Sequence, residues 1–306
     1  MYIIILAVCI LFPEKAVSSA RDAIILWSGA VLPSLFPFFI LSKALYFSGG
    51  MRFFSKILKP VMRLLLIPEE YAFVLAVSLI CGYPTGSRTV GQMMKNGLDD
   101  GDYAACLFCS SGPVFIIGTV GTVMLKSAFL GAVLYYIHVC TLIILSCFLT
   151  PKQKSGVKIN ENIEGGMAQA ISESVLAILN VCGLMVFFGI INGFVSPALP
   201  QNVPLRGLLS GLIEFTGGLN VLSLDSGSLP QMSFLLSFGG ACVISQCLAC
   251  LKGVNACKFI FCRVFSGCIA FLLCLLYTKT AFFMPAAITV LSVAARHIFR
   301  RKKLIC

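Results

Sequence analysis

Seven long apolar runs decide most of what this chain of 306 residues can fold into. A bilayer core is roughly 30 Å thick, and a helix needs about 20 apolar residues to cross it. Only helices or closed barrels satisfy backbone polar groups in lipid, and these runs lack the alternation of barrel strands. The sequence therefore predicts an all-α polytopic membrane protein. The runs are Ile24–Phe47, Tyr103–Leu125, Ser127–Leu149, Gln169–Val195, Leu229–Leu251, Ala256–Tyr277 and Thr280–Ala295.

The composition agrees with a membrane protein. Hydrophobic residues make up 58% of the chain and charged residues 11%, whereas a soluble domain carries about 25% charged residues. The net charge of +11 does not indicate nucleic-acid binding, because the largest basic cluster, 296–303, directly follows an apolar run. An excess of Lys and Arg beside a membrane helix marks the cytoplasmic side. We therefore expect a multi-pass protein of the cell (inner, cytoplasmic) membrane, with the lipid bilayer as partner and no nucleic acid.

Two shorter segments are expected at the membrane surface or near it. The run Tyr2–Phe12 is too short to cross unless its helix continues past Pro13, and it lacks the charged region and cleavage site of a signal peptide. We expect a short membrane helix there; whether it spans stays open. The segment Met51–Ile67 is expected to be a basic amphipathic helix at the cytoplasmic interface. Its cations recur every three or four residues, at Arg52, Lys56, Lys59 and Arg63.

Glycine-rich breaks interrupt corresponding places in the two halves. The first covers 82–88 and the second 214–220, and a further glycine interruption follows each one, at 110–113 and 238–241. In transporters, paired broken segments point to a binding site between two repeats. We predict two repeats, at 1–150 and 169–306, joined by a polar linker at 151–168; the resemblance described below implies a gate-like domain in each.

The charge distribution favours re-entrant hairpins at the two main breaks. With eight full spans and both termini inside, 18 of the 23 Lys and Arg residues face the cytoplasm and 5 face outside. If the second break were a full span, the basic tail would face outside, against the positive-inside rule. We therefore predict about eight full spans plus two hairpins that enter from opposite sides, which makes the repeats inverted.

The first break has the features of an anion site. Gly82, Pro84 and Gly86 free backbone groups that survive at membrane depth only inside protein or against a watery cavity. A half-helix starting near Ser87 would direct its positive end at that cavity, and a bound anion would compensate Arg88 in its first turn. Two alternatives are that Arg88 extends to the interface or pairs with a nearby carboxylate. Those carboxylates are Asp99, Asp100 and Asp102.

The second break carries a carboxylate, Glu214, within apolar sequence. An ionisable residue inside a membrane is a functional hypothesis by default. Glu214 could bind a coupling ion, carry a proton or neutralise Arg88; alternatively it lies nearer the outer surface and pairs with Arg206. The full set of candidate substrate-binding residues is Gly82, Tyr83, Pro84, Thr85, Gly86, Ser87, Arg88, Thr89, Ser110, Ser111, Gly112, Glu214, Thr216, Gly217, Gly218 and Asn220.

Enzymes and metalloproteins are not favoured by this sequence. It contains no nucleophile elbow, zinc-protease or Walker motif, so we expect no enzyme and no cofactor. The pairs Cys106/Cys109 and Cys247/Cys250 have metal-site spacing, but they lie in apolar runs. Cysteine behaves there as a small hydrophobe, so no metal is expected. Transport would have to be passive, ion-coupled or driven by a partner.

Three motifs together resemble the sporulation integral membrane protein YlbJ family. They are Leu32–Ser42, Gly82–Ser87 and Cys109–Gly118. The resemblance implies two gate or nucleoside-recognition domains, a loose relation to concentrative nucleoside transporters, and a role in spore formation with movement of dipicolinate as its proposed task. It supplies no set of binding residues.

The sequence thus predicts a transporter of a small organic anion, with the site between the two hairpins. One alternative is an ion-coupled nucleoside transporter, and another is a membrane scaffold that transports nothing. A scaffold would need no broken helices, so the polar residues at the breaks favour transport.

Overall fold

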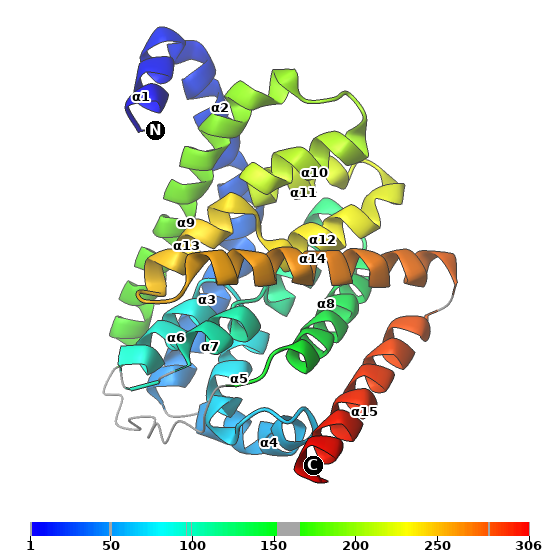
Figure 1. Ribbon diagram of the computed structural model, residues 1–306. Helices are drawn as coiled ribbons and strands as arrows, with labels where there is room; N and C mark the ends of the chain where they lie inside the picture. Colours follow the sequence, from blue (N-terminus) through cyan, green and yellow to red (C-terminus); the bar gives the residue numbers. More distant parts are fainter. Residues whose placement is uncertain are drawn as a thin grey trace.

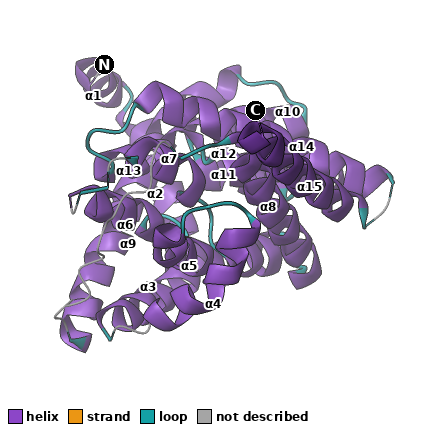
Figure 2. Cartoon of the chain, turned by 60° about the horizontal axis from the view of Figure 1, so that its bottom comes forward, coloured by secondary structure: helices purple, strands orange, loops and turns teal. Residues whose placement is uncertain are grey.

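The computed structural model describes residues 2–48, 51–95, 97–98, 100–151, 166–280 and 282–305. Within these ranges every regular element is a helix and no strand occurs (Figure 2). The α-helices are α1 (Tyr2–Leu11), α2 (Pro13–Leu26), α3 (Leu32–Phe47), α4 (Met51–Leu64), α5 (Ala72–Cys81), α6 (Thr85–Lys95), α7 (Gly101–Phe108), α8 (Ala128–Phe148), α9 (Met167–Val195), α10 (Val203–Ile213), α11 (Phe215–Leu222), α12 (Leu229–Phe238), α13 (Gly240–Cys250), α14 (Ala256–Lys279) and α15 (Met284–Ile305). Short 3-10 or π segments are η1 (Trp27–Val31), η2 (Glu69–Tyr71), η3 (Val114–Met124), η4 (Ser196–Ala198) and η5 (Ser226–Ser228).

The prediction of an all-α polytopic membrane protein is confirmed. Five helical segments in the described ranges are long and apolar enough to cross a bilayer: Pro13–Leu45, Ala128–Phe148, Met167–Ala198, Ser226–Cys250 and Ala256–Lys279. Shorter apolar helices are Val114–Met124, Val203–Ile213 and Met284–Ile298. The number of eight full spans stays a prediction.

Two expected spans differ from the observed helices. The first begins earlier than expected, at Pro13, because α2 continues through the π-helical η1 into α3. The run Tyr103–Leu125 is not one helix, because α7 ends at Phe108 and the next turns are the π-helical η3.

The two short segments that were expected at or near the membrane surface form helices. Helix α1 covers Tyr2–Leu11, and α4 begins at Met51 with Lys56, Lys59 and Arg63 exposed. Figure 1 shows the N-terminus and the C-terminus at opposite ends of the view. The cytoplasmic location of both termini therefore stays a prediction. Of the predicted linker, 152–165 lie outside the described residues.

Each main break forms a pair of short helices that pack on one another. Helices α5 and α6 are joined by a turn at 82–84, and α10 and α11 are joined at Glu214. Helices of 8 to 11 residues are about 12–17 Å long, roughly half the hydrocarbon core. The second break differs in detail from the prediction, since Gly217 and Gly218 lie inside α11 and the chain turns earlier, at Glu214.

The two halves interleave rather than stand side by side. The first helix of the second half, α9, packs along α2 and α3 of the first half. Helix α14 crosses the molecule (orange, Figure 1) and packs on α12, α8 and α7. The centre of the protein is therefore built from both halves, while the repeat boundaries at 150 and 169 stay a prediction.

Close backbone approach holds the α10–α11 pair together. A Cβ added to Gly218 would lie 2.2 Å from the Cα of Gly211 and 2.8 Å from the carbonyl oxygen of Gly207. Gly207 and Gly211 have the small-xxx-small spacing that lets helices approach closely in membranes.

We expect Gly218→Ala to destabilise the protein, because the methyl group would meet backbone atoms that cannot move aside. Such overpacking typically costs about 1–3 kcal/mol. Gly183→Ala is the matched control, since an added Cβ at Gly183 in α9 meets nothing within 4 Å. Thermal unfolding in detergent should show a lower midpoint for Gly218→Ala only. Equal midpoints would contradict the close contact.

Candidate functional site

The tip of the first hairpin meets the second glycine interruption of its own half. Gly82 has a φ of +64°, and a Cβ added there would lie 2.2 Å from the backbone nitrogen of Gly112. Near this contact, the hydroxyl oxygens of Ser78 and Ser110 lie 2.9 Å apart. The glycines at 82 and 112 therefore allow the two breaks of the first half to touch.

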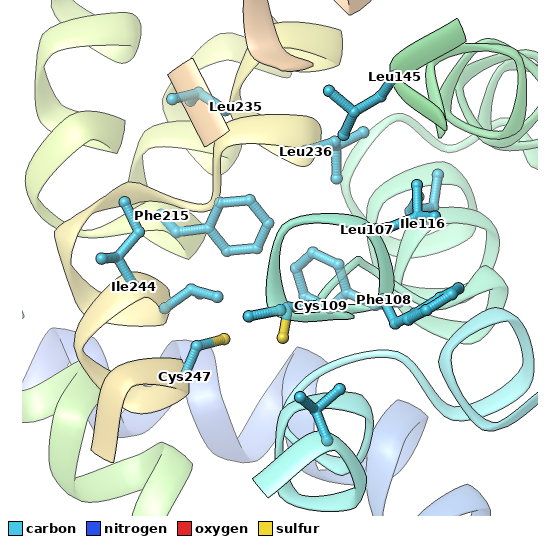
Figure 3. Close-up of a cluster of buried hydrophobic side chains, with 14 of the residues drawn as sticks. Leu107, Phe108, Cys109, Ile116, Leu145, Phe215, Leu235, Leu236, Ile244 and Cys247 are labelled. Carbon is cyan, nitrogen blue, oxygen red and sulfur yellow. The ribbon is translucent and has the colours of Figure 1, made fainter. Parts of the chain in front are cut away.

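The breaks of the two halves are also connected to each other. The Ser111 hydroxyl donates to the carbonyl oxygen of Leu236 at 3.0 Å, near the end of α12. Phe115 of the first half stacks on Phe215 of the second, with ring centroids 5.2 Å apart. Figure 3 shows Phe215 in one buried cluster with Cys109 from the α7 break and Cys247 from α13, whose sulfur atoms face each other.

Arg263 of α14 joins the ends of two broken helices. Its side chain is 1% exposed and donates to the carbonyl oxygens of Cys109 at 2.6 Å, Phe238 at 3.3 Å and Ser237. These carbonyls stand at the C-terminal ends of α7 and α12, where the helix dipole is negative. The guanidinium also lies over the Tyr83 ring, 5.6 Å from its centroid.

Arg263 is a buried residue that the sequence analysis did not select as a candidate. The 18 Lys and Arg residues that were counted as cytoplasmic include Arg263, whereas its side chain is buried inside a candidate span. The position of Arg263 within the apolar run Ala256–Tyr277 could have identified it, because an ionisable residue inside such a run is a functional hypothesis by default.

A central cavity of about 50 Å³ lies where both hairpins and the break at 110–113 meet. Tyr83 and Gly112 come from the first half, and Phe215, Thr216 and Gln246 come from the second. The remaining wall is mainly apolar, with Val31, Leu35, Phe115, Val181, Leu184, Met185 and Val243. A volume of this size holds a few water molecules.

Two polar groups in the wall of the central cavity lack partners. The Tyr83 hydroxyl and the Gln246 amide nitrogen are buried, and neither makes a hydrogen bond within the described part of the chain. Nearly all buried polar groups in proteins are hydrogen-bonded, so each exception calls for an explanation. Gln246 was missed in the sequence analysis, although it is a polar residue within an apolar run.

Glu214 has a definite local role. It is 4% exposed, and its carboxylate accepts hydrogen bonds from the backbone nitrogens of Thr216, at 3.0 Å, and Gly217. It therefore caps the N-terminus of α11. Among the described residues it forms no ion pair, so the structure shows neither the expected pairing with Arg88 nor the one with Arg206.

The candidate residues divide into four groups. Tyr83, Ser111, Gly112 and Thr216 line the central cavity. Thr85, Arg88 and Thr89 line a different cavity, of about 20 Å³, together with Lys43. Asn220 is exposed and faces neither cavity. The others support the breaks without lining either cavity: Gly82, Pro84, Gly86, Ser87, Ser110, Glu214, Gly217 and Gly218.

We expect Arg263→Met to destabilise the protein, because three buried carbonyl groups would lose their donor. Hydrogen bonds to charged groups contribute about 1.5–3 kcal/mol each, and unpaired buried carbonyls add a further cost. Arg263→Lys should recover only part of the loss, since one ammonium cannot reproduce the fork of an arginine.

The control is Arg206→Met, because among the described residues the guanidinium of Arg206 bonds only to the side chains of Ser196 and Gln201. Thermal unfolding in detergent measures all three variants. An Arg263→Met protein as stable as Arg206→Met would show that Arg263 does not hold the breaks.

Comparison with known proteins places these features in a family context. Residues 29–130 match the family model described as Gate: Nucleoside recognition, which spans the first hairpin and the α7 break. The chain is 26% identical to the sporulation integral membrane protein YlbJ of Bacillus subtilis (strain 168), over 80% of this chain and 72% of that protein. No solved structure matches. These findings confirm the resemblance predicted from the motifs: the chain is similar to YlbJ and carries a nucleoside-recognition gate domain in its first half.

Proposed function

We propose that this protein transports a small, flat organic anion, dipicolinate-like in chemistry, through the central cavity during spore formation. The observation that carries the proposal is the pair of unpartnered donors, Tyr83 and Gln246, in a buried cavity between the two halves. Leaving a buried donor unpaired costs about 1–3 kcal/mol. A ligand that offers acceptor oxygens would satisfy both groups.

The surroundings of the two donors favour a flat anion. The stacked rings of Phe115 and Phe215 offer an aromatic surface to a planar ligand. Arg263 lies directly behind the Tyr83 ring and has no carboxylate partner among the described residues, so the potential beside the cavity is positive. A carboxylate bound to Tyr83 and Gln246 would benefit from that charge.

Transport through this cavity requires the hairpins to move. A cavity of about 50 Å³ holds only a few water molecules, so we infer that the described arrangement is a closed one. The proposed inverted repeats provide a mechanism, since either hairpin could move away from the other half and open the cavity to its own side of the membrane. The hydrogen bond from Ser111 to Leu236 would be broken in that motion.

A specific observation also favours nucleoside transport as a second candidate. The central cavity is lined by neutral side chains, and a neutral amide and phenol suit a nucleobase as well as a carboxylate. The family model that matches 29–130 is described by nucleoside recognition. The third alternative, a scaffold, gives no reason for two unpaired donors to be buried together.

We expect Tyr83→Phe and Gln246→Met each to reduce anion uptake by about tenfold, the loss of one hydrogen bond to a charged ligand. Purified protein in liposomes would be tested with labelled dipicolinate, succinate and uridine. Tyr103→Phe is the matched control, because Tyr103 is buried but does not line the cavity. Folding would be checked by thermal unfolding, and neither change should lower the midpoint temperature.

The substrate panel separates the candidate functions. Uptake of dipicolinate but not uridine supports the anion transporter, and the reverse result supports the nucleoside transporter. If the wild-type protein takes up neither solute, the scaffold is the candidate function that remains. Equal uptake by Tyr83→Phe and Tyr103→Phe would show that the central cavity is not the site.

A further inference from the structure

His138 of α8 is a buried ionisable residue with one ring nitrogen left unpaired. Its side chain is 1% exposed, in a helix long and apolar enough to cross the bilayer. Its Nδ1 lies 2.9 Å from the hydroxyl oxygen of Ser237 on α12. Its Nε2 is buried and makes no hydrogen bond with any residue that the structure describes. An ionisable residue inside a membrane is costly to keep and marks a functional site by default.

Ser237 connects His138 to Arg263 and, through it, to the central cavity. Helices α8, α12 and α14 lie side by side (Figure 1). The carbonyl oxygen of Ser237 accepts a hydrogen bond from Arg263, so the imidazole and the guanidinium contact the same residue. The guanidinium lies over the ring of Tyr83, which lines the central cavity. A second buried group without a partner, the hydroxyl of Ser266, lies one turn from Arg263 on α14.

Arg263 is the charged group that governs the electrostatics of this imidazole. The elements packed against α8 are α7, η3, α12, α14 and α15, and neither η3 nor α12 contains an ionisable side chain. Among the described residues, it is the charge of Arg263 that acts on His138. Other ionisable side chains of these helices have contacts elsewhere: Asp102 with Lys258, Cys106 with Cys262, Tyr103 with Tyr71, Tyr135 with Leu79, Tyr136 and Tyr277 with Phe282, Cys140 with Thr289, Arg296 with Ser146 and His297 with Leu64.

The charge in the central cavity decides whether His138 can hold a proton. Two like charges repel each other strongly in a low dielectric, so Arg263 opposes an imidazolium while the cavity holds no anion. A bound carboxylate attracts both cations and reverses that balance. A dicarboxylate brings two negative charges, and Arg263 alone offers one positive charge to match them. A proton on His138 would supply the second.

We propose that His138 is the coupling-proton site of this transporter: its imidazole takes up one proton when the anion binds in the central cavity and returns it when the anion leaves. The inference rests on the proposed function and deepens it by naming the coupling ion. The proton comes from water admitted when a hairpin opens, and one N–H bond forms on the ring. The Ser237 hydroxyl oxygen can accept from the Nδ1–H of the charged ring, so the bond at 2.9 Å survives the change.

The proposal fixes the sign of the pH dependence. Binding of the proton and binding of the anion each strengthen the other by the same factor, because linkage is reciprocal. Anion affinity should therefore rise as the pH falls through the range in which an imidazole changes charge, from about pH 8 to about pH 5. Without an anion the imidazole stays neutral, so the transporter should not leak protons.

The decisive experiment observes the imidazole itself. The chain has two histidines, so isotopically labelled His297→Gln protein in lipid nanodiscs gives nitrogen NMR signals from His138 alone. At about pH 6 we expect a neutral ring without solute, a charged ring with saturating dipicolinate, and a neutral ring with uridine, which carries no charge. A ring that stays neutral with dipicolinate, or is already charged without it, would overturn the proposal.

A variant that cannot take up a proton tests the coupling. His138→Asn places an amide where Nδ1 lay, which can still bond Ser237. Wild-type protein should bind dipicolinate about tenfold more tightly at about pH 5 than at about pH 8, and His138→Asn should lose that gain. Any ionisation of the solute contributes equally to all variants. In liposomes that contain a pH-sensitive dye, a dipicolinate gradient should move protons through the wild-type protein but not through His138→Asn.

Thr141→Val is the matched control. Thr141 is also buried in α8, about one turn from His138, and its hydroxyl donates to the carbonyl oxygen of Ile137 in its own helix. This variant should keep both the pH dependence and the proton movement. Thermal unfolding identifies a variant that loses its fold. His138→Gln then replaces His138→Asn, and the NMR measurement on the native histidine is independent of both.

The outcomes separate this inference from the proposed function. Dipicolinate uptake that moves no protons, or an unchanged pH dependence in His138→Asn, would overturn the coupling site while the transporter remains. A charged ring in the dipicolinate complex would support the coupling site even if liposomes show no uptake, and only the proposed transport would then fail.

Discussion

The guanidinium of Arg263 is the interaction on which the centre of this protein depends. Broken helices leave carbonyl groups without partners, and inside a membrane no water replaces them. Arg263 supplies one rigid set of donors to the ends of α7 and α12, which belong to different halves. Two negative helix ends offset part of the positive charge of Arg263, so the arginine can remain buried without a carboxylate.

The other contacts between the two halves depend on that arrangement. Once α7 and α12 end at the same side chain, the Ser111 hydroxyl can reach Leu236, and Phe115 can stack on Phe215. Tyr83 lies over the same guanidinium, which fixes the tip of the first hairpin beside the cavity. Glycines at 82 and 112 make the approach possible, because larger residues would meet backbone atoms there.

The sequence was sufficient for the fold class, the breaks and part of the site. Run lengths and glycine positions depend on local rules, so the helical character and the Gly82 break could be predicted. Tyr83, Ser111, Gly112 and Thr216 were chosen because they flank breaks, and the structure brings them to one cavity. The roles of Arg263 and Gln246 depend on how α13 and α14 pack against the other half, which no local pattern encodes.

The assignment of Arg88 and Glu214 shows the same limit. Equivalent places in two repeats suggested that they face each other, but a local hydrogen bond was available to Glu214 and a different helix faces Arg88. Capping is a short-range contact that forms within one turn. A cross-repeat ion pair would have had to desolvate two charges, which is costly in a low dielectric.

The cap on α11 has a consequence for the symmetry of the protein. Glu214 is 4% exposed and holds its carboxylate against the backbone amides at the start of that helix. In the second hairpin, a carboxylate of the protein itself therefore binds the free amides at the helix N-terminus. The first hairpin has no such carboxylate, because the first turn of α6 contains no acidic residue, so the starts of α6 and α11 differ in charge.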